Sequence, residues 1–584
     1  MHARNENSNL WTAVGFHRIN DNDQTRNSTS SSWRLTFPPP SIHLDATPNI
    51  FHDWYEKQWG VEDYRSFVGG WYDDEHNNDI NYTIQSNNNI IKPIVFGTID
   101  DHDYGQNNGD YTYQYKKESN IEFVNFLYSG VANDSNVCTQ DVHNSANVCI
   151  ESTSQQQESN RSYDRQKAND PMYHRALKGK GVYGVQLFDF SKTKNDHKSN
   201  NNNNILWGNG YWVPESVAQI DPDVMITSNN ISSSETPSYS TTHSVAIFAL
   251  DVRSNKTPWP KGKQIHTEST IQDTNSSSFN IPPLDFLGEE QWLWFEQALN
   301  NSHATVNIIV SGLQVHPERF PNDGNVVEEW SKFPEARHLL YDTILNSGVT
   351  SPMIVSGDVH MAQFMSKDCV RASDLIRSST SNPQVVRPLV EITTSGMTHS
   401  WGTSFSSQPK HHRLPLKPYS YFVSRVFMTI CHLVCGWNDI LIQSTKEESG
   451  RGKAGLQYYL GLNFAEFEFD FHNEDEGKGG GTVTTRIFGK EEGAPPKLEM
   501  SWTFDELSGN AHVKGNTVQY LQDYLSIENL DDGWLCIPHR GIPSIYREYV
   551  ANTIMFISLC ILFFFPHVIV LYLLRKMWLS WKRV

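Results

Sequence analysis

The chain has 584 residues and a formal net charge of −19 at pH 7. This length gives room for one large domain or a few small ones, with a substantial core. The acidic balance argues against nucleic acid as a partner, because phosphate contacts require Lys and Arg. Seven Cys residues do not make a disulfide scaffold, although Cys138 and Cys149 flank a polar loop and could pair.

The N-terminal segment, residues 1–50, is rich in Asn, Ser and Thr, and we expect it to be irregular. Its first ten residues contain no apolar h-region, so they are not a signal peptide. Aromatic residues at roughly helical spacing predict a helix within residues 51–70.

An acidic cluster follows the apolar, strand-like run at residues 96–99. Residues 100–105 read Asp-Asp-His-Asp-Tyr-Gly, which places three carboxylates and one imidazole within four residues. Such carboxylates repel one another unless a cation neutralises them. The cluster therefore favours a metal site, and the alternative is a solvated acidic loop, which is common in a chain this acidic.

The middle of the chain alternates predicted strands with predicted helices, which indicates an α/β domain. Polar tracts at 129–170 and 191–204 look like surface insertions. An apolar segment at 419–436 is broken by Arg425 and His432, so it predicts a buried helix. The predicted strands are 182–190, 245–250, 306–310 and 389–394, and the predicted helices are 288–300 and 328–345.

A second polar cluster, Ser356-Gly357-Asp358-Val359-His360, follows a strand-like run at 352–355. α/β proteins place their chemistry at the rim where strands end. In an extended segment, Asp358 and His360 would point to one side, as a metal site requires. The alternative for these five residues alone is a polar strand end with a surface His.

The C-terminal part has a different pattern. Phe467, Phe469 and Phe471 alternate with acidic residues and predict a half-buried strand, with antiparallel neighbours at 482–488 and 498–504. Residues 551–574 contain no Asp, Glu, Lys or Arg, and a membrane-spanning helix needs about 20 apolar residues. We therefore expect a transmembrane helix there, strengthened by the basic tail at 575–584; the alternative is a very hydrophobic core helix.

Three unusual segments resemble the PhoD-like metallophosphatases, also called the alkaline phosphatase D family: GTIDDHDYGQNNGD, IVSGDVHMAQF and VEITTSGMTHSW. Weaker matches, FALDVRSNKTP, LGEEQWLWFEQAL, VSGLQVHPERF and GLNFAEFEFDF, follow the family's order, and together the matches span about residues 55–505. The resemblance implies an α/β sandwich of two mixed sheets with helices on the outer faces, within a domain at residues 51–545. It also implies hydrolysis of a phosphate monoester or diester by a water that two metal ions activate.

The resemblance also assigns metal ligands. Asp101-His102 takes the place of the Asn-His pair of the wider metallophosphatase fold, and Asp358-x-His360 that of its His-x-His pair. Asp101, Asp358 and His360 are then expected to bind metal. The better-known members of the family suggest calcium with iron, and hard oxygen ligands would also admit Mg or Mn.

Further side chains are expected around these ligands. His102 would contact the phosphate or act as general acid. Asp103 would either orient His102 or only support the metal ligands, and Asp100 would support the ligands. Arg253 could clamp the phosphate through its planar fork, or could form a structural ion pair with the nearby Asp251.

Two other histidines lie in segments that resemble the family. His399 could line the pocket, or could be held by backbone groups. His316 matches no His of the family's pattern, and we interpret it as structural.

One motif of the family is missing. Its members carry, before the acidic cluster, a strand that ends in a Gly-Asp motif whose Asp bridges the two metals. The nearest candidate, Gly70-Trp71-Tyr72-Asp73, lies too close to the acidic cluster and follows no strand. The alternative function is therefore a catalytically inactive, membrane-anchored binding protein that retains the fold. The sequence indicates neither which phosphate ester is cleaved nor the oligomeric state.

The basic tail predicts topology. A short basic segment after a span stays cytosolic, so we expect the catalytic domain in a lumen or outside the cell. The missing signal and the missing Gly-Asp motif fall at the same end, so we expect a coding segment upstream of Met1. Without it the chain should have little activity. N-glycosylation sequons agree with this topology, with modest weight in an Asn-rich chain: Asn27, Asn81, Asn133, Asn160, Asn230, Asn255, Asn275 and Asn300.

Overall fold

A computed structural model of the chain describes the main elements of one α/β body and shorter pieces elsewhere. The described residues are 97–129, 171–189, 243–259, 282–318, 328–373, 386–396, 440–445, 453–471, 480–491, 493–509 and 533–539, with the short stretches 15–18, 33–36, 139–140, 147–148 and 571–576 and residues 55, 400, 425, 428, 550, 553, 554, 557, 578 and 579. The statements below concern these residues.

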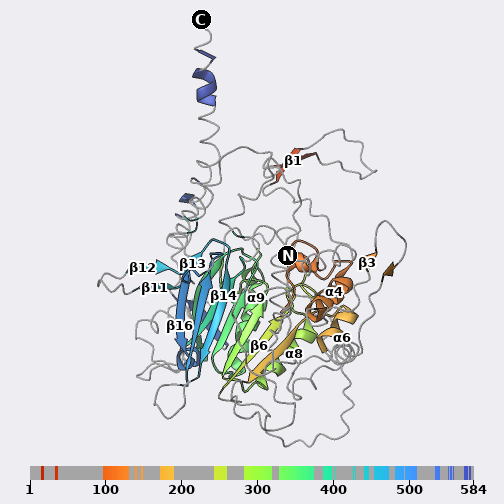
Figure 1. Cartoon of the computed structure of the whole chain (residues 1–584), viewed down its shortest axis with the longest axis vertical. Helices are drawn as coiled ribbons and strands as arrows, with labels where there is room; N and C mark the ends of the chain where they lie inside the picture. Colours follow the sequence, from red (N-terminus) through yellow and green to blue (C-terminus); the bar gives the residue numbers. More distant parts are fainter. Residues whose placement is uncertain are drawn as a thin grey trace, which may run out of the picture.

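A large mixed sheet forms the centre of the body (Figure 1). Its strand order is β13-β9-β10-β8-β7-β6-β5, and β17 also pairs with β9. The strands β6, β7, β8 and β10 are parallel, so their carboxyl ends lie at one edge of the sheet. The bounds are β5 Gly184–Asp189, β6 Ser244–Leu250, β7 Val306–Ser311, β8 Pro352–Ser356, β9 Ala362–Arg371, β10 Arg387–Thr394, β13 Tyr458–Tyr459 and β17 Trp534–Pro538.

Two helices cover one face of this sheet, α8 (Glu289–Asn300) and α9 (Pro334–Asn346). Trp292 and Phe295 of α8 are fully buried, and burying each such side chain stabilises the fold by roughly 1.5–3 kcal/mol. The helix predicted at 328–345 begins only at Pro334, after the short 3-10 turn η3 (Trp330–Lys332). Proline suits the first turn of a helix, whereas the residue before it avoids helical geometry.

A second, three-stranded antiparallel sheet packs on the opposite face of the large sheet, and its strand β16 lies at the left in Figure 1. Phe364 of the large sheet lies with its ring 6.0 Å from that of Trp502. The alternating pattern at 464–470 thus buries one face, as predicted. The other face is exposed along Glu466 and Glu468, so in the described part of the chain no helix covers it, contrary to our expectation. The strands are β14 Phe464–Asp470, β15 Thr482–Phe488 and β16 Leu498–Thr503, followed by α12 Phe504–Ser508.

A small helical unit carries the acidic cluster. It consists of α3 (Asp101–Tyr104), α4 (Lys116–Ser129) and α6 (Pro171–Lys178) around a core that includes Tyr104 and Phe123. The strand expected at 96–99 is not present in its described part, since residues 97–100 pair with no strand and lead directly into α3.

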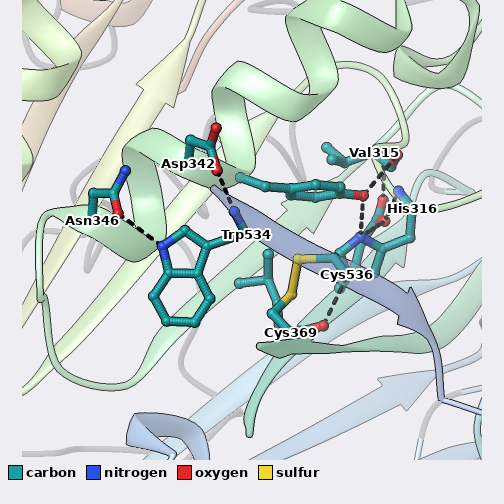
Figure 2. The surroundings of a disulfide bond; sticks show 10 residues. Val315, His316, Asp342, Asn346, Cys369, Trp534 and Cys536 are labelled. Atoms are coloured by element: carbon teal, nitrogen blue, oxygen red, sulfur yellow. Dashed lines mark hydrogen bonds and ion pairs between the residues drawn. A yellow bond between two sulfur atoms is a disulfide. The ribbon is translucent and has the colours of Figure 1, made fainter. Parts of the chain in front are cut away.

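A disulfide between Cys369 and Cys536 joins β9 to β17, where the two residues face each other across the pair (Figure 2). Beside it, the Trp534 indole N–H donates to Asn346 Oδ1 (2.8 Å) and its backbone N–H to Asp342 Oδ1 (3.0 Å). The sequence analysis did not predict this pair, because the two cysteines are 167 residues apart. The pair it considered, Cys138 and Cys149, lies outside the described residues.

Short paired strands occur in three other places. Two of them lie where we expected irregular structure, in the N-terminal segment and in the first insertion. These strands are β1 Gly15–Arg18 with β2 Trp33–Thr36, β3 Thr139–Gln140 with β4 Asn147–Val148, and β11 Ile442–Thr445 with β12 Lys453–Leu456.

The expected transmembrane helix at 551–574 lies mostly outside the described residues. Among the residues that are described, no helix is both long enough and apolar enough to cross a bilayer. Residues 571–576 are helical and exposed. The helix expected at 419–436 also lies outside the described part, except for Arg425 and the buried Met428.

Candidate metal centre

Three carboxylates from two distant segments meet at the carboxyl edge of the parallel strands. Asp100, Asp101 and Asp358 each offer one oxygen, and these oxygens all lie within 4.8 Å of one another. Asp358 follows β8, while Asp100 caps α3 and Asp101 begins it. A set of three hard oxygen donors fits Ca²⁺, Mg²⁺ or Mn²⁺.

Two glycines permit this approach of the segments. A Cβ on Gly312, which follows β7, would lie 3.2 Å from Asp100 Oδ1. A Cβ on Gly357 would lie 3.1 Å from the carbonyl oxygen of Gly312. The loops after β7 and β8 therefore pack closely against each other and against Asp100, and a side chain at either glycine would require its neighbours to shift.

The backbone after β8 is not extended. Asp358 and His360 have φ values of 65° and 56°, in the left-handed region that costs a non-glycine residue roughly 1–3 kcal/mol. Because this segment is not extended, the spacing of two residues does not make the side chains of Asp358 and His360 point to one side, contrary to our prediction. Among the described residues, the group of converging ligand atoms contains Asp358 but not His360.

The electrostatics of the three carboxylates favour a bound positive charge. Burial raises the pKa of Asp358 well above its ordinary value, and the charges of Asp100 and Asp101 raise it further. Burial likewise raises the pKa of Asp100 to about 6, although Arg253 acts in the opposite direction. Like charges in a partly dry site disfavour ionisation, and a cation among them would reverse this effect.

Arg253, which follows β6, is fully buried. Its Nε donates to Asp100 Oδ1 at 3.0 Å, its Nη2 donates to the same oxygen, and its Nη1 donates to Glu328. The structural ion pairs of Arg253 are therefore with Asp100 and Glu328, while Asp251 accepts the backbone N–H of Arg253 at 2.9 Å. Three of the five N–H groups of this guanidinium are thus engaged by carboxylates.

Glu328 and Lys256 are parts of the centre that the sequence analysis missed. Lys256 Nζ lies 2.8 Å from Glu328 Oε1, and both side chains are buried. Lys256 lies three residues after Arg253 within a segment that resembles the family, and this position could have marked it as a candidate site residue. Glu328 lies in an ordinary Val-Val-Glu-Glu-Trp stretch that carries none.

A buried carboxylate holds the end of β8, which leads into Asp358. Glu391 of β10 accepts the Ser356 hydroxyl at 2.6 Å, and it also accepts the backbone N–H groups of Val315 (3.0 Å) and His316 (2.7 Å). Glu391 thus ties β10 to the end of β8 and to the loop after β7.

The remaining predicted residues are placed as follows. The side chain of His102 and all of His399 lie outside the described residues. Asp103 is half-buried in α3, and its carboxylate contributes to raising the pKa of Tyr55 after burial itself. His316 is fully buried, with Nδ1 3.1 Å from the Tyr341 hydroxyl and Nε2 2.8 Å from the Leu389 carbonyl, which fits its structural interpretation (Figure 2).

Comparisons with known proteins gave one family model and one solved structure that match part of this chain. A search of curated proteins gave no match. A solved structure described as "Structure of PhoD" aligns at 11% identity and a TM-score of 0.22, covering 54% of this chain and 48% of that one, so this chain spans about half of its length. A family model described as "PhoD-like phosphatase" matches residues 237–417, the part that contains β6 to β10, Arg253 and Asp358. This part of the chain is therefore similar to the PhoD-like phosphatases.

Proposed function

We propose that this chain is a metal-dependent phosphoester hydrolase. The observation that carries the proposal is the convergence of Asp100, Asp101 and Asp358 at strand ends, because Asp358 lies inside the segment that matches a phosphatase family. The family match suggests metal-dependent hydrolysis of phosphate esters. The finer proposal is a monoesterase or diesterase that uses two metal ions.

In this proposal the three carboxylates hold the cation, and the ion would polarise a phosphoryl oxygen and acidify a bound water. The chain's own contribution is a preorganised set of oxygens, since Arg253 already fixes Asp100. Further roles remain proposals: His360 as an additional ligand, His102 as phosphate contact or general acid, and His399 in the pocket wall.

We also propose a membrane-anchored protein whose catalytic domain lies in a lumen or outside the cell. The disulfide supports this, since such bonds persist mainly in oxidising compartments. Two sequons lie in the described part. Asn300 is exposed at the end of α8, whereas the side-chain amide of Asn255 donates to the Lys180 carbonyl at 3.2 Å. Protease protection of an N-terminal tag in intact vesicles tests the topology, and cleavage from the cytosolic side would reject it.

Hydrolysis of an aryl phosphate monoester and diester, with Mn²⁺ or Ca²⁺ and with a chelator, tests the catalytic proposal. We expect metal-dependent turnover, with kcat/KM lowered at least about 100-fold in Asp358→Asn, because loss of a ligand exceeds the 10–100-fold typical of its supporting groups. The control Asp470→Asn alters an exposed carboxylate of β14 and should retain activity. Absence of turnover in the full-length wild type with either metal would instead support the inactive binding protein.

A further inference from the structure

Beneath the three carboxylates lies a buried ionic triad, defined here as Arg253, Lys256 and Glu328. The exposed fractions of the three side chains are 0%, 0% and 3%. Glu328 Oε2 accepts from Arg253 Nη1, and Glu328 Oε1 lies 2.8 Å from Lys256 Nζ. One carboxylate thus binds two cationic side chains. The triad carries a net positive charge, and its Arg253 contacts Asp100 of the acidic site.

One branch of the triad leads to Asp100. Both the Nε and the Nη2 groups of Arg253 donate to the same oxygen, Asp100 Oδ1. Neither bond uses Oδ2, so the guanidinium group sets the direction of the carboxylate and leaves its second oxygen for a cation. Because Nη1 of Arg253 is bound to Glu328, the orientation of the whole guanidinium plane depends on Glu328.

The other branch leads to Asp101 through the loop after α3. Lys256 Nζ donates to the carbonyl of Asn108 at 2.8 Å and lies 3.3 Å from that of Gly109. The backbone N–H of Asn108 in turn donates to Asp101 Oδ2 at 3.2 Å. Asn108 has a left-handed φ of 54°, a conformation that few residues other than Gly, Asn and Asp adopt readily. Lys256 therefore holds the left-handed residue whose backbone N–H contacts Asp101.

A purely structural role explains this arrangement poorly. Burial of charged groups costs free energy, and replacing a buried ionic network by apolar side chains is often neutral or stabilising. Burial lowers the pKa of Lys256, and Glu328 opposes that effect, so the ammonium group depends on its partner. What apolar side chains could not supply is the fixed direction of two carboxylates on a different segment of the chain.

We propose that Glu328 is a positioning residue that orients Asp100 and Asp101 for cation binding, through Arg253 and Lys256 respectively. This inference rests on the metal site of the proposed function. It adds that the affinity of the site depends on a carboxylate that itself binds no metal.

The test measures binding of Mn²⁺ alone to the purified full-length protein, by calorimetry or by the electron paramagnetic resonance signal of the free ion. Glu328→Gln keeps the size of the side chain and removes its charge, and we expect Mn²⁺ affinity to fall about 10–100-fold. Lys256→Met should also weaken binding, and Lys256→Arg, which keeps the charge, should restore most of it. The matched control is Glu329→Gln. This adjacent buried carboxylate binds Lys332 (3.3 Å) and the Ser331 hydroxyl (2.7 Å) instead, so Mn²⁺ affinity should stay at the wild-type value.

An unchanged Mn²⁺ affinity in Glu328→Gln would overturn the inference. An equal loss of Mn²⁺ affinity in Glu329→Gln would also overturn it, because the loss would then reflect a general destabilisation of this part of the fold. Should Glu328→Gln fail to fold, the comparison of Lys256→Met with Lys256→Arg decides, and equal affinities in these two variants would reject the positioning role. Wild-type protein that binds no Mn²⁺ would reject both the inference and the metal site. Wild-type protein that binds Mn²⁺ but hydrolyses no ester would reject only the proposed function.

Discussion

Two arginines in this molecule each contact more than one carboxylate, but in opposite surroundings. Arg253 beneath the metal centre is fully buried between Asp100 and Glu328. Arg486 on the outer face of the second sheet is 25% exposed, and its carboxylate partners are 50–61% exposed. Those partners are Glu466 (3.1 Å), Glu468 (2.7 Å) and Glu499 (3.6 Å).

The difference shows that the number of ion pairs says little about their effect. Around Arg486, water and salt screen each attraction, and the carboxylates are simply its neighbours on adjacent strands. Arg253 and Glu328 are buried, so solvent cannot replace a partner that either of them loses, although the side chain of Asp100 is 27% exposed. Because it is buried, the cluster around Arg253 fixes the orientation of its carboxylates, whereas the cluster around Arg486 mainly keeps the surface polar.

The largest effect is expected for Arg253→Met. Removing this cation leaves Glu328 and Asp100 without their buried partner, and breaking such a pair typically costs about 3–5 kcal/mol in the free energy of unfolding. Denaturant unfolding measures the loss. Arg253→Lys keeps the charge but not the three contacts, and it should fall between the variant and the wild type. If Arg253→Met lost less than about 1 kcal/mol, as is typical of an exposed ion pair, burial would not be what makes the Arg253 ion pairs important.

A covalent link provides a comparison that does not depend on charge. Cys536→Ser removes the bond between β9 and β17, and loss of a native disulfide typically costs about 2–4 kcal/mol. Because no ion pair is lost, the cost should be the same at low and high salt. Wild-type protein treated with a thiol reductant should lose stability, and the loss should be smaller in the variant. Free thiols at both positions in a peptide map of the untreated protein would refute the link.

Sequence reasoning succeeded where local pattern decides structure. The apolar runs that became β6, β7 and β8 and the alternation of β14 each follow from the burial of whole strands or of one face. It missed β9, since Gln363, Ser366 and Lys367 are buried within that strand and hide its apolar pattern.

The same limit applies to the site. The two acidic clusters could be identified because each follows a recognisable local motif, and the structure brings them within 4.8 Å. The partners of Arg253 could not be predicted, because Asp100 and Glu328 are 153 and 75 residues away and only the fold brings them together. The left-handed backbone at Asp358 was equally hidden, since a strained conformation is maintained by packing around it rather than by local sequence.

A smaller effect is expected from His316, which is buried beside charged groups yet neutral. Burial lowers its pKa well below 6.5, with Lys367 and Arg337 acting in the same direction, and Glu391 lies 3.7 Å from its ring. As pH falls below about 6.5, the unfolded chain binds a proton that the folded protein does not, so stability decreases, by at most about 1.4 kcal/mol per pH unit. Unfolding free energies of the wild type and His316→Gln between pH 7.5 and pH 5, a range chosen around the ordinary His pKa of about 6.5, isolate this dependence. Identical slopes in the two proteins would contradict the prediction, because they would mean that His316 has the same pKa in the folded and the unfolded chain.

The smallest effect is expected for Arg486→Met, and it tests the other side of the comparison. Although this substitution removes contacts with three carboxylates, each is exposed, and surface ion pairs of this kind contribute little. We expect no measurable change in Tm at physiological salt and no change in Mn²⁺ affinity. A small decrease that appears only at low salt would agree, because added salt weakens the attraction between solvent-exposed charges. A loss as large as that of Arg253→Met at every salt concentration would mean that the number of carboxylate partners matters more than their burial. The distinction between the two clusters would then fail.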